Sequence, residues 1–425
     1  MNLFLFEDTA VDRLSPITLT RPAWTISCGS YRLIDLMMER SFSAIGSQVR
    51  PHLQALQTGD WPNLKRPEEI CESSESVLLL NARIVPSIAN VEEISKLATA
   101  AESSNEVRLY LAGDVVAAAV GPSALVSDGN VTAENLQAIA AQQGISVSSH
   151  ATTLKLFEYP HDVIGQHMAE CGNSIKHRIS TGDYQQLADG VFVANASPQT
   201  TLPDSCHFDT REGPVVFESN IRVGPFCFFR GPVHVAANCK ISEHSSIKDS
   251  VAISHTCKMG GEIEGVQTEA WSNKQHFGFL GHSWIGSWIN LGAGTCNSDL
   301  KNTYGTVNMT YDKEKVSTGM QFVGCVIGDY SRSAINTSIY TGKTIGVGST
   351  LYGITTRNVP SFVNWAQVLD QYGEVPPEVI ATIQKRMFAR RDVEQRPCDI
   401  RLISDVFSMT SGERDPNWSS DPVPQ

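Results

Sequence analysis

The sequence has no paired cysteines, no long apolar run and no excess of positive charge. Its ten cysteines are scattered and form no CxxC pair, which argues against a disulfide framework or a thiolate zinc site and is typical of a reducing compartment. No segment approaches the ~18 apolar residues of a membrane span, so we expect no membrane partner. A net charge of −12 argues against a nucleic-acid partner, although small anionic substrates respond to local charge.

The N-terminus also lacks the features of an export signal. Residues 1–10, MNLFLFEDTA, carry no basic stretch ahead of their apolar residues, so we interpret them as a first strand and expect a cytoplasmic protein. The composition, 41% hydrophobic and 18% charged, is ordinary for a globular protein. A length of 425 residues allows two or three domains.

The first part of the chain, residues 1–190, has an α/β pattern. Short apolar runs at 3–6, 77–80 and 107–112 predict buried strands. Patterns at 31–45 and 90–103 predict helices between them. Strands that alternate with helices indicate a mostly parallel sheet.

The pattern then changes to a period of six, which predicts a β-helix over 191–356. An apolar or small residue returns at every sixth position from Val215 to Ile263, and a second series follows two residues later. Three such units make one triangular coil of a hexapeptide β-helix. The stretch 305–321 breaks the period, and we expect a loop that projects from one corner. The residues expected inside the prism include Val233, Ile241, Ile253, Ile285 and Ile345.

The sequence of the C-terminal region, 357–425, predicts a helix that caps the coils and a tail that follows it. Residues 377–393 have a helical pattern with Val379, Ile383 and Met387 on one face. A solenoid needs a cap on its open end, and this helix is a candidate for it. The last fifteen or so residues are expected to be disordered.

The strongest local motif lies within 272–302. It places His276 before Leu280 and Gly281, then Asn290, then a Gly-Ala-Gly-Thr run and a Cys-Asn pair. This order resembles the acetyltransferase domain of the GlmU family, which joins N-acetylglucosamine-1-phosphate uridyltransferase and glucosamine-1-phosphate acetyltransferase activities. The resemblance implies a Rossmann-like nucleotidyltransferase domain, a left-handed β-helix, acetyl-CoA as co-substrate and a homotrimer with sites between neighbouring prisms.

The resemblance also implies roles for single residues. His276 would be the general base that takes a proton from the attacking amine, since a neutral imidazole suits that step at working pH. Asn290 would hold the sugar, and Asn297 would contact the acetyl group or its developing oxyanion. Both asparagines could instead be ordinary turn residues. The residues expected to hold coenzyme A are Gly292, Ala293 and Gly294 beside its arm and, at its phosphates, Arg386 and Arg390.

One departure from the family puts the acceptor in question. The family has paired lysines ahead of its histidine, where this chain has Glu264 and Gly265. Another cation would then have to hold the phosphate of the sugar. The candidates are Lys258, Lys274, Lys301 and Arg230, and each could instead be a solvated surface charge.

The N-terminal domain resembles a nucleotidyltransferase that lacks parts of its site. Residues 13–22, RLSPITLTRP, match the Arg-Leu-x-Pro-Leu-Thr element, but no glycine-rich turn precedes them and Ala23 stands at the lysine position. Arg83 stands where a metal-binding aspartate is expected. We therefore expect no metal site, and Mg²⁺ only if nucleotidyl transfer is retained. The residues that could still bind a phosphate are Arg13, Arg21 and Arg83.

The sequence thus favours an acyltransferase that moves an acetyl or other acyl group from coenzyme A to an amino sugar phosphate such as glucosamine-1-phosphate. Two alternatives stay open. One is an active sugar-1-phosphate nucleotidyltransferase with unfamiliar site residues, and the other is a non-catalytic trimeric scaffold. Thiol release from acetyl-CoA separates the first function from both alternatives.

Overall fold

The structure is a computed structural model that describes residues 1–100, 106–126 and 131–415. The chain forms two compact units. The first comprises Met1–Leu14, Thr20–Ile26 and Tyr31–Glu158, and the second comprises Ser15–Leu19, Ser27–Ser30 and the remainder from Tyr159. The boundary therefore lies before residue 160 and not at 190 as expected, because the long helix α6 (Pro160–Thr181) packs on the coils through Cys171 and Ile175.

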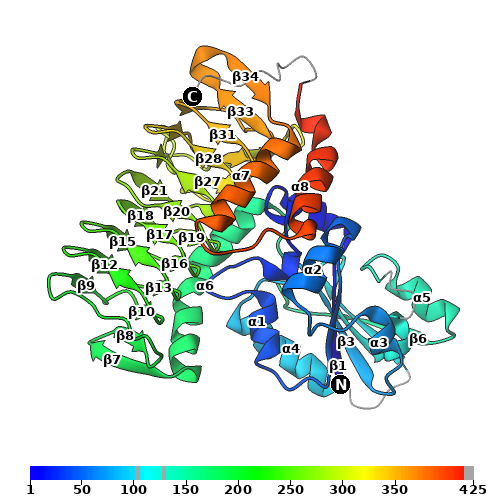
Figure 1. Cartoon of the computed structure of the whole chain (residues 1–425). Helices are drawn as coiled ribbons and strands as arrows, with labels where there is room; N and C mark the ends of the chain where they lie inside the picture. The colour runs from blue at the N-terminus through cyan, green and yellow to red at the C-terminus, as the bar shows by residue number, and fades with distance from the viewer. Residues whose placement is uncertain (101–105, 127–130, 416–425) are drawn as a thin grey trace. The chain divides into compact units, whose positions relative to one another are not determined.

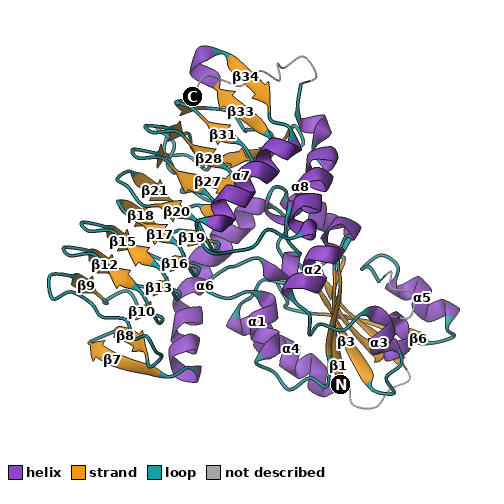
Figure 2. Ribbon diagram, viewed as in Figure 1, coloured by secondary structure: helices purple, strands orange, loops and turns teal. Residues whose placement is uncertain are grey.

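The first unit is built on one sheet (Figure 2). Its six strands have the order β2-β1-β3-β5-β4-β6. Strand β1 is parallel to both of its neighbours, whereas β5 is antiparallel to both of its own. The sheet is therefore mixed, because β4 and β5 are joined by a short turn. The strands are β1 (Asn2–Phe6), β2 (Ile45–Gln48), β3 (Ser76–Asn81), β4 (Glu106–Ala112), β5 (Val115–Pro122) and β6 (Ser146–Ala151).

The helices of the first unit are short. They are α1 (Leu33–Met38), α2 (Gln54–Asp60), α3 (Pro67–Cys71), α4 (Ile88–Ala100) and α5 (Leu136–Gln142). The prediction of a helix over 31–45 was wrong beyond Met38, because the chain turns there and enters β2 at Ile45. The three predicted strands are confirmed as β1, β3 and β4, and most of their apolar side chains, among them Phe4 and Leu79, are buried, whereas Leu111 in β4 is half-buried.

The second unit is a stack of three-sided coils, the predicted β-helix (Figure 1). Each strand pairs in parallel with the strand one coil further along, as Val215 does with Val233 and Val233 with Val251, except that the terminal strand β7 pairs antiparallel with β8. The first face contains β7 (Tyr184–Ala188), β8 (Val191–Ala194), β10 (Val215–Phe217), β13 (Val233–Val235), β16 (Val251–Ile253), β19 (Gln267–Thr268), β22 (Trp284–Ile285), β27 (Cys325–Ile327) and β30 (Lys343–Ile345).

The other two faces follow the same rule, except that the terminal strand β34 pairs antiparallel with β33. The second face contains β11 (Arg222–Val223), β14 (Lys240–Ile241), β17 (Lys258–Met259), β20 (Asn273–Lys274), β23 (Asn290–Leu291), β28 (Arg332–Ser333), β31 (Thr350–Leu351), β33 (Val363–Ala366) and β34 (Gln371–Glu374). The third face contains β9 (His207–Asp209), β12 (Phe228–Arg230), β15 (Ser246–Lys248), β18 (Glu262–Glu264) and β21 (Phe279–Gly281), followed by β24 (Cys296–Asn297), β29 (Ser338–Ile339) and β32 (Ile354–Thr355).

The interior of the prism holds the residues that the period of six predicted. The five predicted core residues are at most 2% exposed: Val233, Ile241, Ile253, Ile285 and Ile345. Aliphatic and small side chains from successive coils stack in register, which removes their apolar surface from water. One exception is Lys274, which follows Ile241 and Met259 in the same inward-facing position.

The interruption of the period is a hairpin, not the loop that we expected. Strands β25 (Asn308–Tyr311) and β26 (Glu314–Ser317) pair antiparallel. The hairpin docks on the start of α6, where the rings of Tyr159 and Tyr311 stack at 5.2 Å and His161 Nδ1 lies 2.9 Å from the Tyr311 hydroxyl.

Two helices follow the coils, α7 (Pro377–Ala389) and α8 (Pro397–Met409). The predicted apolar face of the first was wrong, because Val379 is exposed while Ile380 and Phe388 are buried. Phe388 packs on Trp288 at the edge of the coils, with ring centroids 4.4 Å apart.

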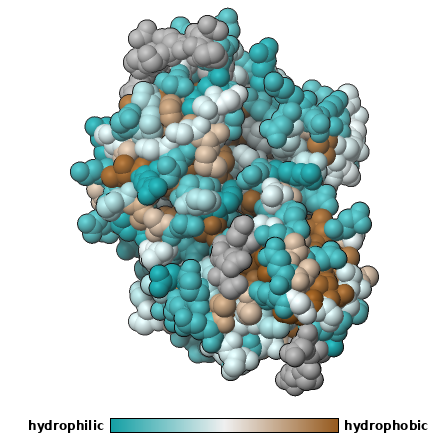
Figure 3. Space-filling view, turned by 90° about the vertical axis from the view of Figure 1, so that its right-hand side faces the viewer, coloured by the Kyte–Doolittle hydropathy of each residue, from teal (hydrophilic) through white to brown (hydrophobic). Residues whose placement is uncertain are grey.

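Part of the tail that we expected to be disordered is ordered. Arg414 is buried, stacks on the ring of Phe407 at 4.1 Å and pairs with Glu374 at 2.7 Å. The rest of the predicted tail, 416–425, lies outside the described residues. Within the described ranges, no helix combines the length and apolarity needed to cross a membrane. The face in Figure 3 is mostly hydrophilic, with hydrophobic residues in separate groups.

Candidate active site

His276 lies at the corner where the chain turns from the second face to the third, between β20 and β21. Its side chain is exposed. No described residue forms a hydrogen bond with the imidazole, although the backbone carbonyl accepts one from Lys274. A histidine that is surface-placed and not engaged by the protein can reach a ligand, which is what a general base requires.

Lys274 is inside the prism and does not reach a substrate. Only 3% of it is exposed, and Nζ donates to the carbonyl oxygens of Gly260 and His276, each at 2.9 Å. Burial lowers the pKa of its ammonium group to about 8. The expectation that Lys274 binds the sugar phosphate was therefore wrong: the lysine ties two successive coils together beneath the histidine.

The side chain of Asn297 is also engaged in hydrogen bonds within the coil. Its Oδ1 accepts from the backbone N–H of Gly281 at 2.8 Å, and Nδ2 donates to the Gly281 carbonyl at 2.9 Å and to the Ser283 hydroxyl at 3.3 Å. The side chain is 5% exposed. A developing oxyanion would have to displace bonds that hold the wall of the prism, so this geometry contradicts the role expected for Asn297.

Asn290 and the glycine run lie at the second face and the corner next to His276. Asn290 is exposed and stands directly beside Asn273 on the neighbouring strand. The glycines have a structural reason as well, because a Cβ on Gly292 would lie 2.6 Å from the backbone of Ala334. Gly294 has a φ of +75°, which L side chains rarely adopt. Gly292, Ala293 and Gly294 are partly exposed.

The basic residues of the third face are neutralised by their neighbours. Arg230 grips Asp249 with two hydrogen bonds, one of which joins Nε to Oδ1 at 2.6 Å. Lys248 pairs with Glu262 at 2.9 Å and with Glu264 at 3.2 Å. Arg230 is therefore engaged and not available as the phosphate-binding cation that we expected. A phosphate on this face would also meet the carboxylates.

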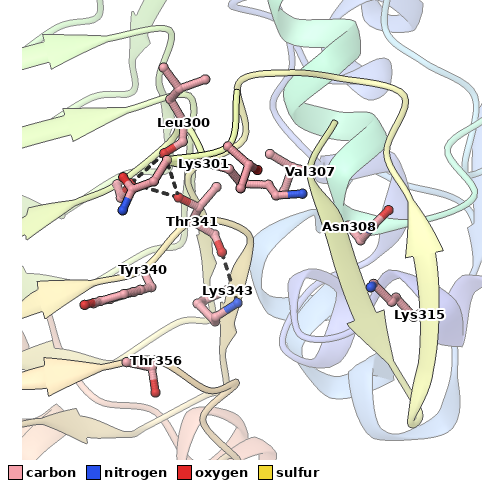
Figure 4. Close-up of a pocket in the computed structure, with 12 residues that line it drawn as sticks. Leu300, Lys301, Val307, Asn308, Lys315, Tyr340, Thr341, Lys343 and Thr356 are labelled. Atoms are coloured by element: carbon pink, nitrogen blue, oxygen red, sulfur yellow. Dashed lines mark hydrogen bonds between the residues drawn. The ribbon is translucent and has the colours of Figure 1, made fainter. Parts of the chain in front are cut away.

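A cavity of about 520 Å³ opens at a different corner, where the third face meets the first (Figure 4). Among the described residues that line it are three lysines and no carboxylate. Lys301 Nζ donates to the Thr306 carbonyl at 2.9 Å, and Lys343 Nζ donates to the Thr341 carbonyl at 3.0 Å. Lys315 faces them from the hairpin (Figure 4). The lining residues are Ser298, Leu300, Lys301, Asn302, Thr303, Val307, Asn308, Lys315, Tyr340, Thr341, Lys343 and Thr356.

This lysine pocket contains one expected residue, Lys301, and two that sequence reasoning missed. The sequence offered a signal for Lys315, since it lies in the stretch that breaks the period of six. Lys343 meets Lys301 only because the coil register brings residues 298–301 and 340–343 to one corner, as the hydrogen bond between the Ser298 and Thr341 hydroxyls shows at 2.8 Å. Burial lowers the pKa of the Lys343 ammonium group.

In the first unit, side chains of the protein itself occupy the place where a ligand would be expected. In an open α/β sheet, ligands bind where the carboxyl ends of strands diverge, here after β1 and β3. Asp8 and Arg83 follow these strands and form a buried pair, with Nε–Oδ1 at 2.8 Å and Nη2–Oδ2 at 2.6 Å. Asn81 donates to the same carboxylate at 2.7 Å. The expectation that Arg83 binds a phosphate was wrong, because it is 2% exposed.

The neighbouring positions are also occupied. Glu7 accepts from the backbone N–H of Ala23 at 2.9 Å and pairs with Arg50 at 3.0 Å. Of the other expected phosphate ligands, Arg13 is exposed and Arg21 is buried. In the described ranges, no three His, Cys, Asp or Glu side chains are grouped to hold a metal ion. A guanidinium beside Asp8 does not fit Mg²⁺.

Comparisons with known proteins agree with the two-part organisation. Residues 3–178 match the family described as sugar nucleotidyl transferase. Over 193 residues the chain is 28% identical to the bifunctional protein GlmU of Acinetobacter baylyi, covering 44% of this chain and 34% of that protein. Over 326 residues it is 26% identical to the GlmU of Nitrosospira multiformis, covering 72% and 63%. The aligned part is thus under two thirds of either relative.

A crystal structure of a Bacillus cereus protein, described as a provisional acetyltransferase, matches 49% of this chain and 99% of its own. It is 12% identical with a TM-score of 0.27, a similarity too low to carry an inference.

Proposed function

We propose, from the premise that the chain is a GlmU-like protein of the sugar nucleotidyltransferase/acetyltransferase family, that it transfers an acyl group from coenzyme A to an amino sugar phosphate. The observation that carries this proposal is the placement of His276. The histidine stands exposed at a coil corner, next to the partly exposed Gly-Ala-Gly run, with no described residue bonded to its imidazole.

The imidazole of His276 would take a proton from the amine of the acceptor. The amine nitrogen then attacks the thioester carbonyl, a C–N bond forms, and the C–S bond breaks. The proton passes from the imidazolium to the departing thiolate, so coenzyme A leaves as a thiol. A positioned acid–base group of this kind accelerates a reaction by about two to four orders of magnitude.

The acceptor would be held by its phosphate in the lysine pocket and not on the third face. The pocket offers Lys301, Lys315 and Lys343 without a lining carboxylate, whereas the third face offers Glu264 beside Lys248. Asn290, exposed on the second face, would contact the sugar.

His276 and the lysine pocket lie at different corners of the prism, so one chain does not complete this site. A C3 homotrimer, in which a corner of one prism meets another corner of the next, would join them. The trimer is therefore part of the proposal.

The acyl donor would lie along the corner formed by Gly292, Ala293 and Gly294. Arg386 and Arg390, both exposed at the end of α7, would contact its phosphates. A supply of acyl-CoA and ten cysteines without disulfides fit a cytoplasmic protein.

The test is a screen of amino sugar phosphates with acetyl-CoA, in which release of the thiol is followed with a thiol-reactive dye. His276→Ala should lose roughly two to four orders of magnitude in rate. His244 is a matched control, because it is exposed at the same corner two coils earlier, and His244→Ala should keep the parent rate. Equal rates for the parent and His276→Ala would contradict the mechanism.

Nucleotidyl transfer by the first unit is a second candidate, favoured by the family match over residues 3–178. The pair of Asp8 and Arg83 opposes it, because it occupies the place of the metal and the phosphates. We expect no pyrophosphate release from common nucleoside triphosphates with hexose-1-phosphates, and robust release would overturn this expectation.

A further inference from the structure

A column of basic residues runs along the outer side of the second face, away from the lysine pocket. Strands β11, β14 and β17 begin with Arg222, Lys240 and Lys258, and the register places each beside the next. Neighbouring strands lie about 4.8 Å apart. Of the inward residues of the same strands, Ile241 and Met259 are buried and Val223 is half-buried, so the three basic side chains share one outer surface.

The end of α7 adds two more positive charges to this surface. Arg391 donates to Asn273 Oδ1 at 2.6 Å, and Asn273 is the rung directly after Lys258. Packing of Phe388 on Trp288 holds this end of the helix on the coils. Arg390 is the exposed neighbour of Arg391. The basic column is thus Arg222, Lys240, Lys258, Arg390 and Arg391.

None of the five has a carboxylate partner within the described part of the chain. This differs from the third face, where Arg230 and Lys248 are paired with acidic residues. Burial, and then the charges of Arg391, Arg390 and Lys240, lower the pKa of Lys258. In a chain with a net charge of −12, the column gathers cations that repel one another, and a bound anion would relieve that repulsion.

We propose that the basic column binds a small ligand that carries two or more phosphate groups. One carboxylate or one phosphate would neutralise only part of the five positive charges. Arginine guanidinium groups and lysine ammonium groups both donate hydrogen bonds to phosphate oxygens. Three rungs span only about 10 Å, which is the length of an oligophosphate and not of an extended nucleic acid. If the ligand is coenzyme A, this proposal rests on the proposed function. If the ligand is a free oligophosphate, the proposal is independent of that function.

Calorimetric titration of the full-length chain with inorganic tripolyphosphate and with coenzyme A tests the proposal. Both should bind, and added salt should weaken the binding. The double variant Lys240→Gln/Lys258→Gln should bind at least tenfold more weakly, because two of the five charges are lost. Its folding should be unchanged, since both side chains point outward and have no partner among the described residues. The matched control is Lys176→Gln/Lys313→Gln, which removes two other exposed lysines and should bind like the parent.

Further titrations identify which kind of ligand carries the phosphates. Coenzyme A that binds tenfold tighter than both dephospho-coenzyme A and tripolyphosphate would assign the site to the acyl donor, and equal binding would assign it to oligophosphates in general. His276→Ala should bind both probes like the parent, so a failure of the proposed acyl transfer would leave this site standing. Absence of binding to the parent, or equal affinity of the double variant, would overturn the proposal. So would tighter binding of a single-stranded oligonucleotide.

Discussion

Lys274 Nζ donates a hydrogen bond to the backbone carbonyl of His276 across 2.9 Å, from inside the prism to the exposed corner. A buried ammonium group thus supports the backbone of the proposed base. Lys274 occupies an inward-facing position that Ile241 and Met259 fill in the two preceding coils. Because its charge is costly to bury there, the pKa of the ammonium group is lowered to about 8.

Lys274→Met should change how stability depends on pH. The pKa of Lys274 in the folded chain, about 8, lies below the ordinary value of 10.5, so the unfolded chain binds more protons between these values and stability rises with pH across that window. The cost of burying the charge, up to about 3 kcal/mol, is fully present below pH 8. We expect the melting temperature of the parent, but not of the methionine variant, to rise from pH 8 to pH 10.5.

The same variant should lower the acyl-transfer rate, because the corner carrying His276 loses its hydrogen bond. Lys176→Met is a suitable control, since Lys176 is an exposed residue of α6 that belongs to none of the proposed sites. It should keep both the parent rate and the rise in stability. A methionine variant with the pH dependence of the parent would show that Lys274 is not buried in the folded protein.

Asn297→Ala should act on stability and not on the chemical step. It leaves the backbone N–H of Gly281 without its partner in a buried position, which costs about 1–3 kcal/mol. We expect a lower melting temperature and a rate per folded molecule close to that of the parent. A rate at least a hundredfold lower at an unchanged melting temperature would restore the oxyanion role.

Lys315→Gln tests the acceptor end of the proposed site. Lys315 is an exposed residue of the hairpin that lines the lysine pocket, so its loss should raise KM for an acceptor that carries a phosphate by about tenfold, roughly 1.4 kcal/mol. The same acceptor without its phosphate should be unaffected. Lys313→Gln, two residues away and outside the pocket lining, should behave like the parent. Equal KM values for the Lys315→Gln and Lys313→Gln variants would show that the lysine pocket does not bind the acceptor.

Arg83→Ala should destabilise the first unit strongly. It leaves the carboxylate of Asp8 buried without its cation, a loss of about 3–5 kcal/mol. The measurement is the thermal unfolding profile, with the exposed Arg13→Ala as the neutral comparison. An unchanged profile together with lost nucleotide binding would instead make Arg83 a ligand-binding residue.

The architecture was largely predictable because a solenoid repeats one local rule. Six-residue spacing alone identified the interior side chains, and Val233 and Ile345 confirm it at opposite ends of the stack. The same rule failed at Lys274, because periodicity specifies a position and not the residue that fills it. A lysine can be accommodated there because the carbonyls of Gly260 and His276 accept from its ammonium group.

The candidate site was less predictable, since it depends on contacts between residues distant in the chain. The motif around His276 is local, and the sequence displayed it. The pairing of Asp8 with Arg83 joins the ends of two strands, and the meeting of Lys301 with Lys343 joins two coils. No sequence pattern encodes such pairs, so Arg83 was taken for a phosphate ligand and Lys343 was missed.

The hairpin β25–β26 leaves the coils in register on either side of it. Asn290 pairs with Arg332, and Leu291 with Ser333, although the whole inserted segment lies between them in the chain. A corner of this prism can therefore receive foreign sequence without repacking of the core. The chain could serve as a display scaffold, in which a peptide grafted at the hairpin tip, near Asp312, would be presented on the paired strands β25 and β26.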